Sequence, residues 1–198
     1  MCVAIVKPKE KTITKKELSQ AWETNPDGAG FAFSKAGKLH CFKSMDKDKF
    51  INTALDTMTK INETFLIHFR IATQGAINLD NAHPFFVNKN LAFIHNGHIP
   101  GMKDSEKISD TRYFNIDILQ QLPYKMNNKT HDKLISSAIG YSKLAFLNNA
   151  GEYNIINEDL GSWKRGIWFS NLNHCQAPKL STNQTIWRYN GMNWDKEF

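Results

Sequence analysis

Short apolar runs that end in polar residues alternate along this chain with segments that carry helix-start signals. The first run, MCVAIV, predicts a strand at about residues 2–6. The sequence TKKE at residues 14–17 is a capping box, which predicts a helix that begins there. The turn cluster NPDGAG at residues 25–30 leads into FAFSKAGKLHCF, a predicted hairpin that closes near Ala36 and Gly37.

Two later apolar runs each predict a buried strand that ends in polar residues. They are FLIHFRIAT at residues 65–73 and LAFIHNGHI at residues 91–99. The remaining expected elements are helices at residues 46–61 (capped by Ser44), 110–121 and 131–139, and strands at residues 142–148, 153–157, 166–170 and 185–189, with turns at NNAGE and YNGMN.

Many strands flanked by helices, without a regular strand–helix alternation, indicate an α+β fold. Two packed sheets between helical layers would bury the apolar faces of both kinds of element. The length of 198 residues suits a single domain over residues 1–198. The polar clusters would then lie at strand ends, where a rigid scaffold can hold chemistry.

Composition narrows the class of protein. The chain is 41% hydrophobic, which argues against disorder, and no apolar run approaches the roughly 20 residues that span a bilayer. A cytoplasmic protein is therefore expected. The sparse cysteines, Cys2, Cys41 and Cys175, exclude a disulfide scaffold and a thiolate zinc cage.

The net charge of +6 permits contact with an acidic partner, but the lysines are scattered. A solvated loop leading into a helix is favoured over a nucleic-acid-binding arm for the densest cluster. That cluster comprises Lys7, Lys9, Lys11, Lys15 and Lys16.

Cys2 stands directly after the initiator methionine, which is normally removed before a small second residue. An N-terminal cysteine combines a nucleophile with a base. The thiol has a reference pKa of about 8.5 and the α-amino group one of about 7.7–8.0, so the free amine can accept the thiol proton near neutral pH. The alternative is a buried cysteine that fills a strand.

The sequence HNGH at residues 95–98 follows an apolar run. The side-chain amide of Asn96 and the backbone N–H of Gly97 have the composition of an oxyanion hole. A simple Asn-Gly turn is the alternative. His95 and His98 lack a third ligand at a suitable spacing, so no metal site is expected.

Arg70 lies in an otherwise apolar run, where burying its charge is costly unless an anion pairs with it. A substrate carboxylate would suit, with the hydroxyl of Thr73 as a further donor. An internal salt bridge from Arg70 to Asp27 or Asp110 is an equally suitable alternative.

Asp110 lies at a predicted helix start, where it would act either as a plain N-cap or as the acceptor of a substrate ammonium. His83, held before Pro84 in DNAHPF, would either orient a substrate or satisfy a turn. An arginine for a carboxylate and an aspartate for an ammonium would together recognise a free α-amino acid.

In this order, the segments MC, NPDGAG, HFRIATQG, NAHPF, HNG and SDT closely resemble the glutaminase domain of class II glutamine amidotransferases, which are N-terminal nucleophile hydrolases. These segments run from residue 2 to about residue 114. Looser similarity continues through SKLAFLNNAGEYNIIN and GIWFSN. The resemblance implies a four-layer αββα sandwich of mainly antiparallel sheets and a reaction that needs no cofactor or metal.

The resemblance also implies a role for each matching residue. Cys2 would attack the side-chain amide of glutamine with its own α-amino group as base, and Asn96 and Gly97 would form the oxyanion hole. Ammonia would leave first, and water would then release glutamate from a γ-glutamyl thioester. The implied substrate-binding and supporting residues are Arg70 and Thr73 for the α-carboxylate, Asp110 for the α-ammonium, His83 lining the pocket and Asp27 supporting the nucleophile.

The chain departs from the family pattern at Val3, Thr24, Ile71 and Gln74, where the family usually has glycine, arginine, tryptophan and histidine. An amidohydrolase for a different γ-glutamyl or small amide is therefore one alternative. A basic binding module that has lost turnover is another. No P-loop or Rossmann fingerprint marks a synthase domain, so the ammonia would pass to a separate synthase chain unless the protein acts alone.

Overall fold

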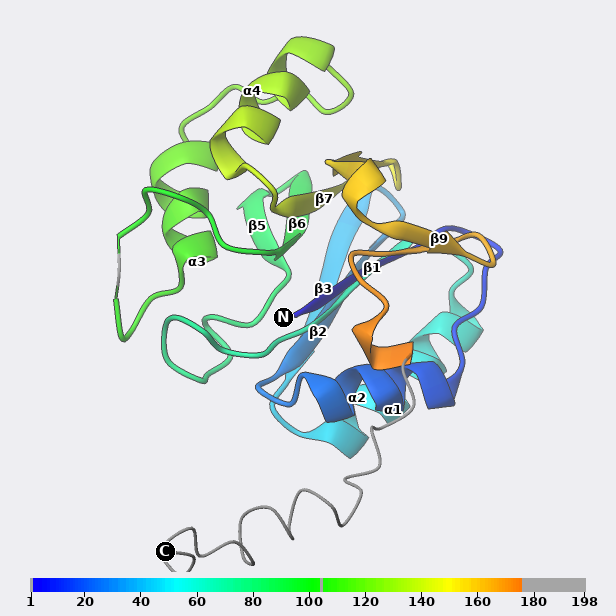
Figure 1. Ribbon diagram of the computed structural model, residues 1–198. Coiled ribbons are helices and arrows are strands. Elements are labelled where there is room, and N and C mark those ends of the chain that lie inside the picture. The colour runs from blue at the N-terminus through cyan, green and yellow to red at the C-terminus, as the bar shows by residue number, and fades with distance from the viewer. Residues whose placement is uncertain (1, 104, 176–198) are drawn as a thin grey trace, which may run out of the picture.

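A computed structural model describes residues 2–103 and 105–175 of the chain. It contains two antiparallel sheets (Figure 1). The six-stranded sheet has the order β3 (Lys38–Ser44), β2 (Ala29–Lys35), β4 (Phe65–Phe69), β1 (Val3–Lys7), β10 (Ile167–Phe169) and β9 (Ser162–Lys164). The four-stranded sheet has the order β5 (Phe85–Asn88), β6 (Leu91–Asn96), β7 (Lys143–Asn148) and β8 (Tyr153–Ile156).

Helices cover the outer face of each sheet. The helices α1 (Lys15–Thr24) and α2 (Lys47–Lys60) share an apolar cluster with the six-stranded sheet. The helix α3 (Asp110–Phe114), the π-helix η1 (Asn115–Leu119) and the helix α4 (Lys129–Ile139) share another with the four-stranded sheet. Short 3₁₀ turns occur at η2 (Glu158–Leu160) and η3 (Asn173–Cys175).

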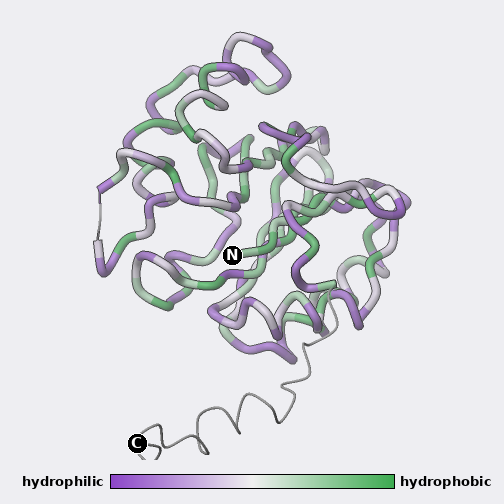
Figure 2. The backbone as a smooth tube through the Cα atoms, viewed as in Figure 1, coloured by the Kyte–Doolittle hydropathy of each residue, from purple (hydrophilic) through white to green (hydrophobic). Residues whose placement is uncertain are grey.

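A third apolar cluster joins the two sheets face to face. It draws Val6, Leu66 and Trp168 from one sheet and Ile94 and Ala145 from the other. Along the backbone tube, hydrophobic stretches gather in the strands at the middle of the molecule, whereas the outlying loops are mostly hydrophilic (Figure 2). The prediction of an α+β sandwich with two packed sheets between helical layers is confirmed.

Local sequence signals predicted several element ends correctly. The Thr14 hydroxyl accepts from the Glu17 backbone N–H while the Glu17 side chain accepts from the Thr14 N–H, which completes the expected capping box. The β2–β3 hairpin closes at Ala36 and Gly37, both with positive φ (50° and 72°). A two-residue turn of this kind matches the twist of the strands that it joins.

Other predictions were wrong in detail. The expected helix at residues 110–121 is a short α-helix that continues as the π-helix η1. The strand β4 ends at Phe69, so Arg70 and Thr73 lie in the loop that follows it. The short strands β5 and β9 were not anticipated. The strand expected at residues 185–189 and the YNGMN turn lie outside the described residues.

The cap of α2 is Asp46 rather than Ser44. The Asp46 carboxylate accepts from the Lys49 backbone N–H at 2.8 Å, whereas the Ser44 hydroxyl accepts from the Asp46 N–H at 3.0 Å as β3 ends.

We therefore expect Asp46→Ala to lower the free energy of unfolding by about 1 kcal/mol. Asp46→Asn should lower it much less, because asparagine is an equally good N-cap residue. Urea denaturation measures both, and a larger loss for Ser44→Ala than for Asp46→Ala would contradict the assignment.

The lysine cluster is not wholly a solvated loop. Lys7 is buried, its ammonium donates to the carbonyls of Pro8 and Lys11 at 3.0 Å, and burial lowers its pKa. The Lys9 ammonium lies 3.9 Å from the Glu63 carboxylate. Two of the clustered charges are thus engaged within the chain itself. Among the described residues, no helix is both long and apolar enough to cross a membrane.

Candidate active site

Residues from separate segments meet in a cavity of about 30 Å³ at the ends of the central strands. Its lining includes six of the predicted site residues, namely Cys2, Arg70, Thr73, His83, Gly97 and Asp110. Asn96 and Asp27 hydrogen-bond to the same segments from outside the cavity lining. Side-chain alternation along the strands explains why Cys2 and Arg70 lie on the same face of the six-stranded sheet. Ala4 and His68 are partners in register and face inward. Cys2 and Arg70 are each two residues from one of them, so they face inward too.

Cys2 is held at the start of β1, the strand between β4 and β10. Its sulfur lies 3.3 Å from both the backbone nitrogen and the carbonyl oxygen of Ile71. Burial raises the pKa of the Cys2 thiol, and the Ile71 N–H and the Arg70 charge only partly offset this effect. The thiol therefore needs a base to become nucleophilic, because the thiolate is the reactive form.

Asn96 ends β6 and directs its side chain toward Cys2. Its Nδ2 donates to the Cys2 carbonyl at 2.6 Å, and its Oδ1 has no partner in the described part of the chain. Gly97 has φ of 136°, and a Cβ there would lie 2.2 Å from the Ser142 hydroxyl. Only glycine fits this position. No tight hairpin closes at Asn96 and Gly97, because the strand that pairs with β6 begins only at Lys143.

Asn171 was missed by sequence reasoning. Its Nδ2 donates to the same Cys2 carbonyl at 2.8 Å, from a segment that follows β10. The preceding Ser170 exchanges backbone and side-chain hydrogen bonds with Ala4 at 2.8 and 2.9 Å. The only signal in the sequence was a polar pair at the end of a short apolar run, GIWFSN, the pattern that marks the other site segments.

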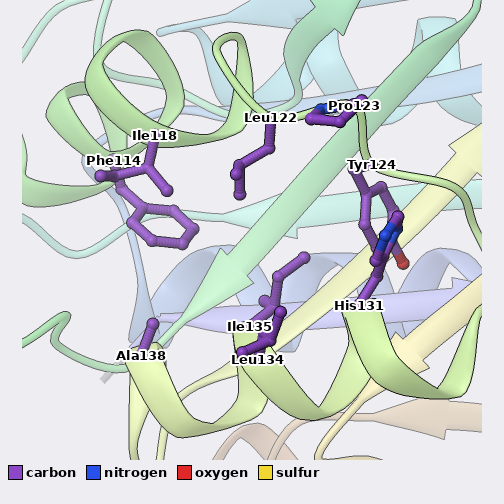
Figure 3. A pocket seen from close by; sticks show the side chains of 9 residues that line it. All are labelled: Phe114, Ile118, Leu122, Pro123, Tyr124, His131, Leu134, Ile135 and Ala138. Carbon is purple, nitrogen blue, oxygen red and sulfur yellow. The ribbon is translucent and has the colours of Figure 1, made fainter.

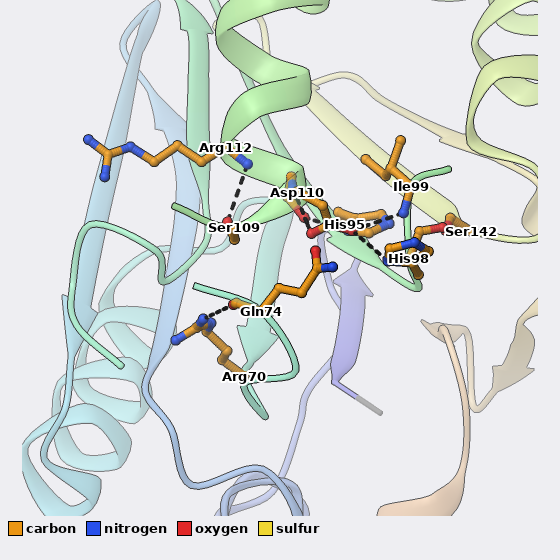
Figure 4. Close-up of polar contacts among 10 residues, drawn as sticks. Arg70, Gln74, His95, His98, Ile99, Ser109, Asp110, Arg112 and Ser142 are labelled. Atoms are coloured by element: carbon orange, nitrogen blue, oxygen red, sulfur yellow. Dashed lines mark hydrogen bonds and ion pairs between the residues drawn. The ribbon is translucent and has the colours of Figure 1, made fainter. Parts of the chain in front are cut away.

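Arg70 is buried, but it makes no ion pair with a described residue. Its guanidinium donates to the carbonyls of Gly75 (3.2 Å) and Ala76 (3.0 Å). It also donates to the carbonyl of Gln74 at 2.8 Å, the bond that Figure 4 draws. The internal salt bridge to Asp27 or Asp110 is therefore contradicted. Burial lowers the pKa of Arg70, and the negative charges of Cys2, Asp27 and Asp110 oppose this at longer range. Arg70 organises the loop of residues 70–76 around its own side chain.

Asp27 ties a second loop to the same segment. Its carboxylate accepts from the Ala72 N–H at 2.8 Å, and its backbone N–H donates to the Arg70 carbonyl at 2.9 Å. The Arg70 N–H in turn donates to the Gly28 carbonyl at 2.8 Å. These contacts fix the end of β4 against the loop that leads into β2, which is compatible with the supporting role predicted for Asp27.

Asp110 is not the N-cap of α3, because Ser109 accepts from the Arg112 N–H in that position. The Asp110 carboxylate instead accepts from the backbone N–H groups of Ile99 (2.9 Å) and Thr111 (2.7 Å). His98 approaches it to 3.5 Å. The carboxylate thus fastens the loop after Gly97 to the start of α3. Figure 4 shows the Gln74 side chain extended toward Asp110 and His98.

A group of buried histidines completes the cavity, and only His83 among them was predicted as a site residue. The His95 backbone N–H donates to His83 Nδ1 at 3.2 Å, and His95 Nδ1 lies 2.7 Å from the Thr111 hydroxyl. The ring centroids of His68 and His83 are 4.0 Å apart. Burial lowers the pKa of His68 to about 3 and that of His95 to about 4, and it lowers the pKa of His83 strongly. All three imidazoles are therefore neutral at neutral pH.

A second cavity, of about 380 Å³, lies between η1 and α4 (Figure 3). Its lining is mostly apolar, with Phe114, Leu122 and Ile135 among its members, and it includes none of the predicted site residues. Although it is the larger of the two, it brings no nucleophile and no oxyanion donor together. The predicted site residues therefore gather in the smaller cavity rather than in this one.

Comparison with known proteins identifies the family and the fold. The family model of class II glutamine amidotransferases matches residues 13–160. A Haemophilus influenzae protein named "Putative glutamine amidotransferase" is 30% identical over 88 residues, which is 41% of this chain and 30% of that protein.

Two solved structures share the fold. A glutamine phosphoribosylpyrophosphate amidotransferase from B. subtilis, complexed with ADP and GMP, has a TM-score of 0.56 at 16% identity, over 85% of this chain and 41% of its own. The other, described as the allosteric regulatory enzyme of purine biosynthesis, has a TM-score of 0.55 with the same identity and coverage. The chain thus spans less than half the length of each of these relatives. The match to three quarters of the sequence and the shared sandwich establish that the chain belongs to the class II glutamine amidotransferases.

Proposed function

We propose that this protein hydrolyses the side-chain amide of glutamine to glutamate and ammonia, with Cys2 as an N-terminal nucleophile. The observation that carries the proposal is the 2.6 Å hydrogen bond from the Asn96 amide to the Cys2 carbonyl, with Gly97 lining the same cavity as the Cys2 sulfur. This arrangement brings a thiol, a free amine and two oxyanion donors into one site once the initiator methionine is removed. Family membership supports the substrate class.

In the proposed reaction, the α-amino group of Cys2 takes the thiol proton and the thiolate attacks the γ-carbonyl carbon of glutamine. A C–S bond forms, and the negative charge on the carbonyl oxygen is stabilised by the Asn96 amide and the Gly97 N–H. The C–N bond then breaks as the nitrogen takes the proton from the α-ammonium group. Water hydrolyses the resulting thioester and releases glutamate.

The predicted substrate contacts require the loop of residues 70–76 to move. A cavity of about 30 Å³ accommodates about one or two water molecules, far less than glutamine. The Arg70 donors are engaged with loop carbonyls, and the Asp110 carboxylate with backbone N–H groups. In the proposal, the glutamine α-carboxylate replaces these carbonyls at Arg70 and Thr73, and Asp110 turns toward the α-ammonium. His83 and Asp27 keep the positions that they already have.

A different γ-glutamyl or small amide is the second candidate substrate. The observation that favours it is that Ile71 and Gln74, where the family usually has tryptophan and histidine, both line the cavity. Comparing ammonia release from glutamine, asparagine and γ-glutamyl amides distinguishes the two candidates. In either case, we propose that the ammonia passes to a separate synthase chain.

The nucleophile is tested by intact mass and by labelling with a glutamine-mimicking electrophile. We expect a mature chain that lacks methionine and that carries a single adduct on Cys2. Cys2→Ala should abolish the labelling. Cys41→Ala is the matched control, because Cys41 is also a free thiol but lies exposed on β3. Retained methionine, or equal labelling of Cys2→Ala and the wild type, would show that the mechanism is wrong.

A further inference from the structure

The cavity beside Cys2 offers hydrogen-bonding atoms that the proposed reaction does not use. His68 and His95 are 0% and 2% exposed. Nε2 of His95 has no hydrogen-bond partner in the described part of the chain, and the ring nitrogens of His68 have none of good geometry, their nearest acceptor being the His95 backbone. Buried polar atoms are nearly always paired, so unpaired nitrogens that line a cavity indicate a ligand.

The fold makes specific room for these rings. Gly30 on β2 lies opposite His68 in register, and a Cβ at Gly30 would lie 2.1 Å from the His83 carbonyl oxygen. The segment that carries His83 can pass this close only because residue 30 has no side chain. The contact between the His68 and His83 rings is therefore a built feature of the sheet rather than a gap in its packing.

The size and charge of the cavity limit what it can bind. While the loop of residues 70–76 stays in place, its volume of about 30 Å³ holds about one or two molecules the size of water. Each neutral imidazole presents one N–H donor and one acceptor nitrogen. The Arg70 guanidinium lines the same cavity, while the Asp110 carboxylate is engaged with the N–H groups of Ile99 and Thr111. A small neutral molecule with both N–H groups and a lone pair fits this lining better than a cation does.

We propose that His68, His83 and His95 form a binding site for the ammonia released from the substrate, held as neutral NH₃ next to the thioester. This inference rests on the proposed function. When the amide C–N bond breaks, the nitrogen takes a proton from the Cys2 α-ammonium and stays hydrogen-bonded to His68. In the reverse step, the ammonia nitrogen bonds to the carbonyl carbon of the thioester and the C–S bond breaks. The nitrogen gives one proton back to the α-amino group.

Isotope exchange tests the site in the intact protein. Wild-type protein is incubated with glutamine and ammonium that carries heavy nitrogen. Mass spectrometry then follows the label entering glutamine, alongside glutamate formation. We expect the ratio of exchange to hydrolysis to saturate with ammonia concentration. Methylamine, which is larger by one carbon, should react about tenfold less well, because a methyl group replaces one of the N–H groups that the buried imidazoles can accept.

His68→Leu should lower the ratio of exchange to hydrolysis by about tenfold, as expected for a ligand that loses a hydrogen bond in a buried site. The matched control is His40→Leu, since His40 is exposed on β3, outside the cavity, and the ratio should not change.

A ratio that rises linearly with ammonia, equal reaction with methylamine, or an unchanged ratio in a folded His68→Leu protein would each overturn the ammonia site and leave the proposed function intact. Wild-type protein that neither hydrolyses glutamine nor forms the Cys2 adduct would overturn both. If His68→Leu does not fold, the saturation and methylamine measurements on wild-type protein decide the question.

Discussion

Replacing Asn96 with alanine is expected to lower kcat for glutamine hydrolysis by about 100- to 1,000-fold, the usual effect of removing one oxyanion donor. The Asn96 amide has two N–H groups, and one already binds the Cys2 carbonyl at 2.6 Å. The second is free for the oxygen that becomes charged in the transition state. Steady-state measurement of ammonia release gives kcat and KM separately, and KM should change little.

Asn171→Ala is the matched control, because Asn171 donates to the same Cys2 carbonyl at 2.8 Å and is not a predicted oxyanion donor. Its loss leaves that carbonyl with Asn96 alone, so we expect a decrease in kcat of about tenfold, the equivalent of one ordinary hydrogen bond. Equal effects of the two substitutions would mean that Asn96 only positions Cys2. Asn171→Asp, which replaces the donor with an acceptor, should lower kcat more than Asn171→Ala does.

Acidification from about pH 7.5 to about pH 5.5 is expected to lower the free energy of unfolding by about 3–4 kcal/mol. Burial lowers the pKa of His68 to about 3 and that of His95 to about 4, and lowers that of His83 well below its usual value. In the unfolded chain these side chains titrate near 6.5, so below this pH the unfolded state binds more protons. The stability that these neutral histidines contribute is therefore fully present above pH 6.5. It is lost as the pH falls toward their pKa values in the folded protein, at about 1.4 kcal/mol per histidine for each pH unit.

Urea denaturation at a series of pH values measures this slope. His68→Asn should reduce it by about a quarter to a third, because His68 is one of four described histidines whose pKa burial lowers, the fourth being His174. A slope equal to that of the wild type would contradict the burial of a neutral His68. Between about pH 6.5 and pH 5 the change in stability comes from the histidines. Glu17 is a carboxylate with a lowered pKa, so its protonation affects stability only at more acidic pH.

Sequence alone predicted the features that depend on neighbouring residues. The capping box at Thr14 and the hairpin at Ala36 and Gly37 are local patterns, and both occur as expected. The meeting of six predicted residues in one cavity followed from the order of the family segments rather than from any single segment. Where two polar residues competed for one cap, as Ser44 and Asp46 do, sequence could not rank them, because the choice depends on where β3 stops.

Contacts between distant segments were beyond sequence reasoning. A buried arginine is expected to pair with an anion. The guanidinium of Arg70 instead donates to three carbonyls of its own loop. Asn171 reaches Cys2 across 169 positions of sequence, and no local pattern indicates such a pairing. Sequence placed His68 in a buried strand but did not predict its contact with His83. That contact depends on Gly30, in a third segment, which has no side chain to keep the segment of His83 away.

The position of β1 has a consequence for the order of events during protein synthesis. In the proposed mechanism methionine must be removed from Cys2, and this can happen as soon as the N-terminal segment emerges from the ribosome, before the surroundings of Cys2 exist. Its strand is closed on one side by β10, and its carbonyl is held by Asn171, both among the last described residues to be made. The thiol is thus exposed when it must be processed. It acquires its final position only after nearly all of the described chain has been translated.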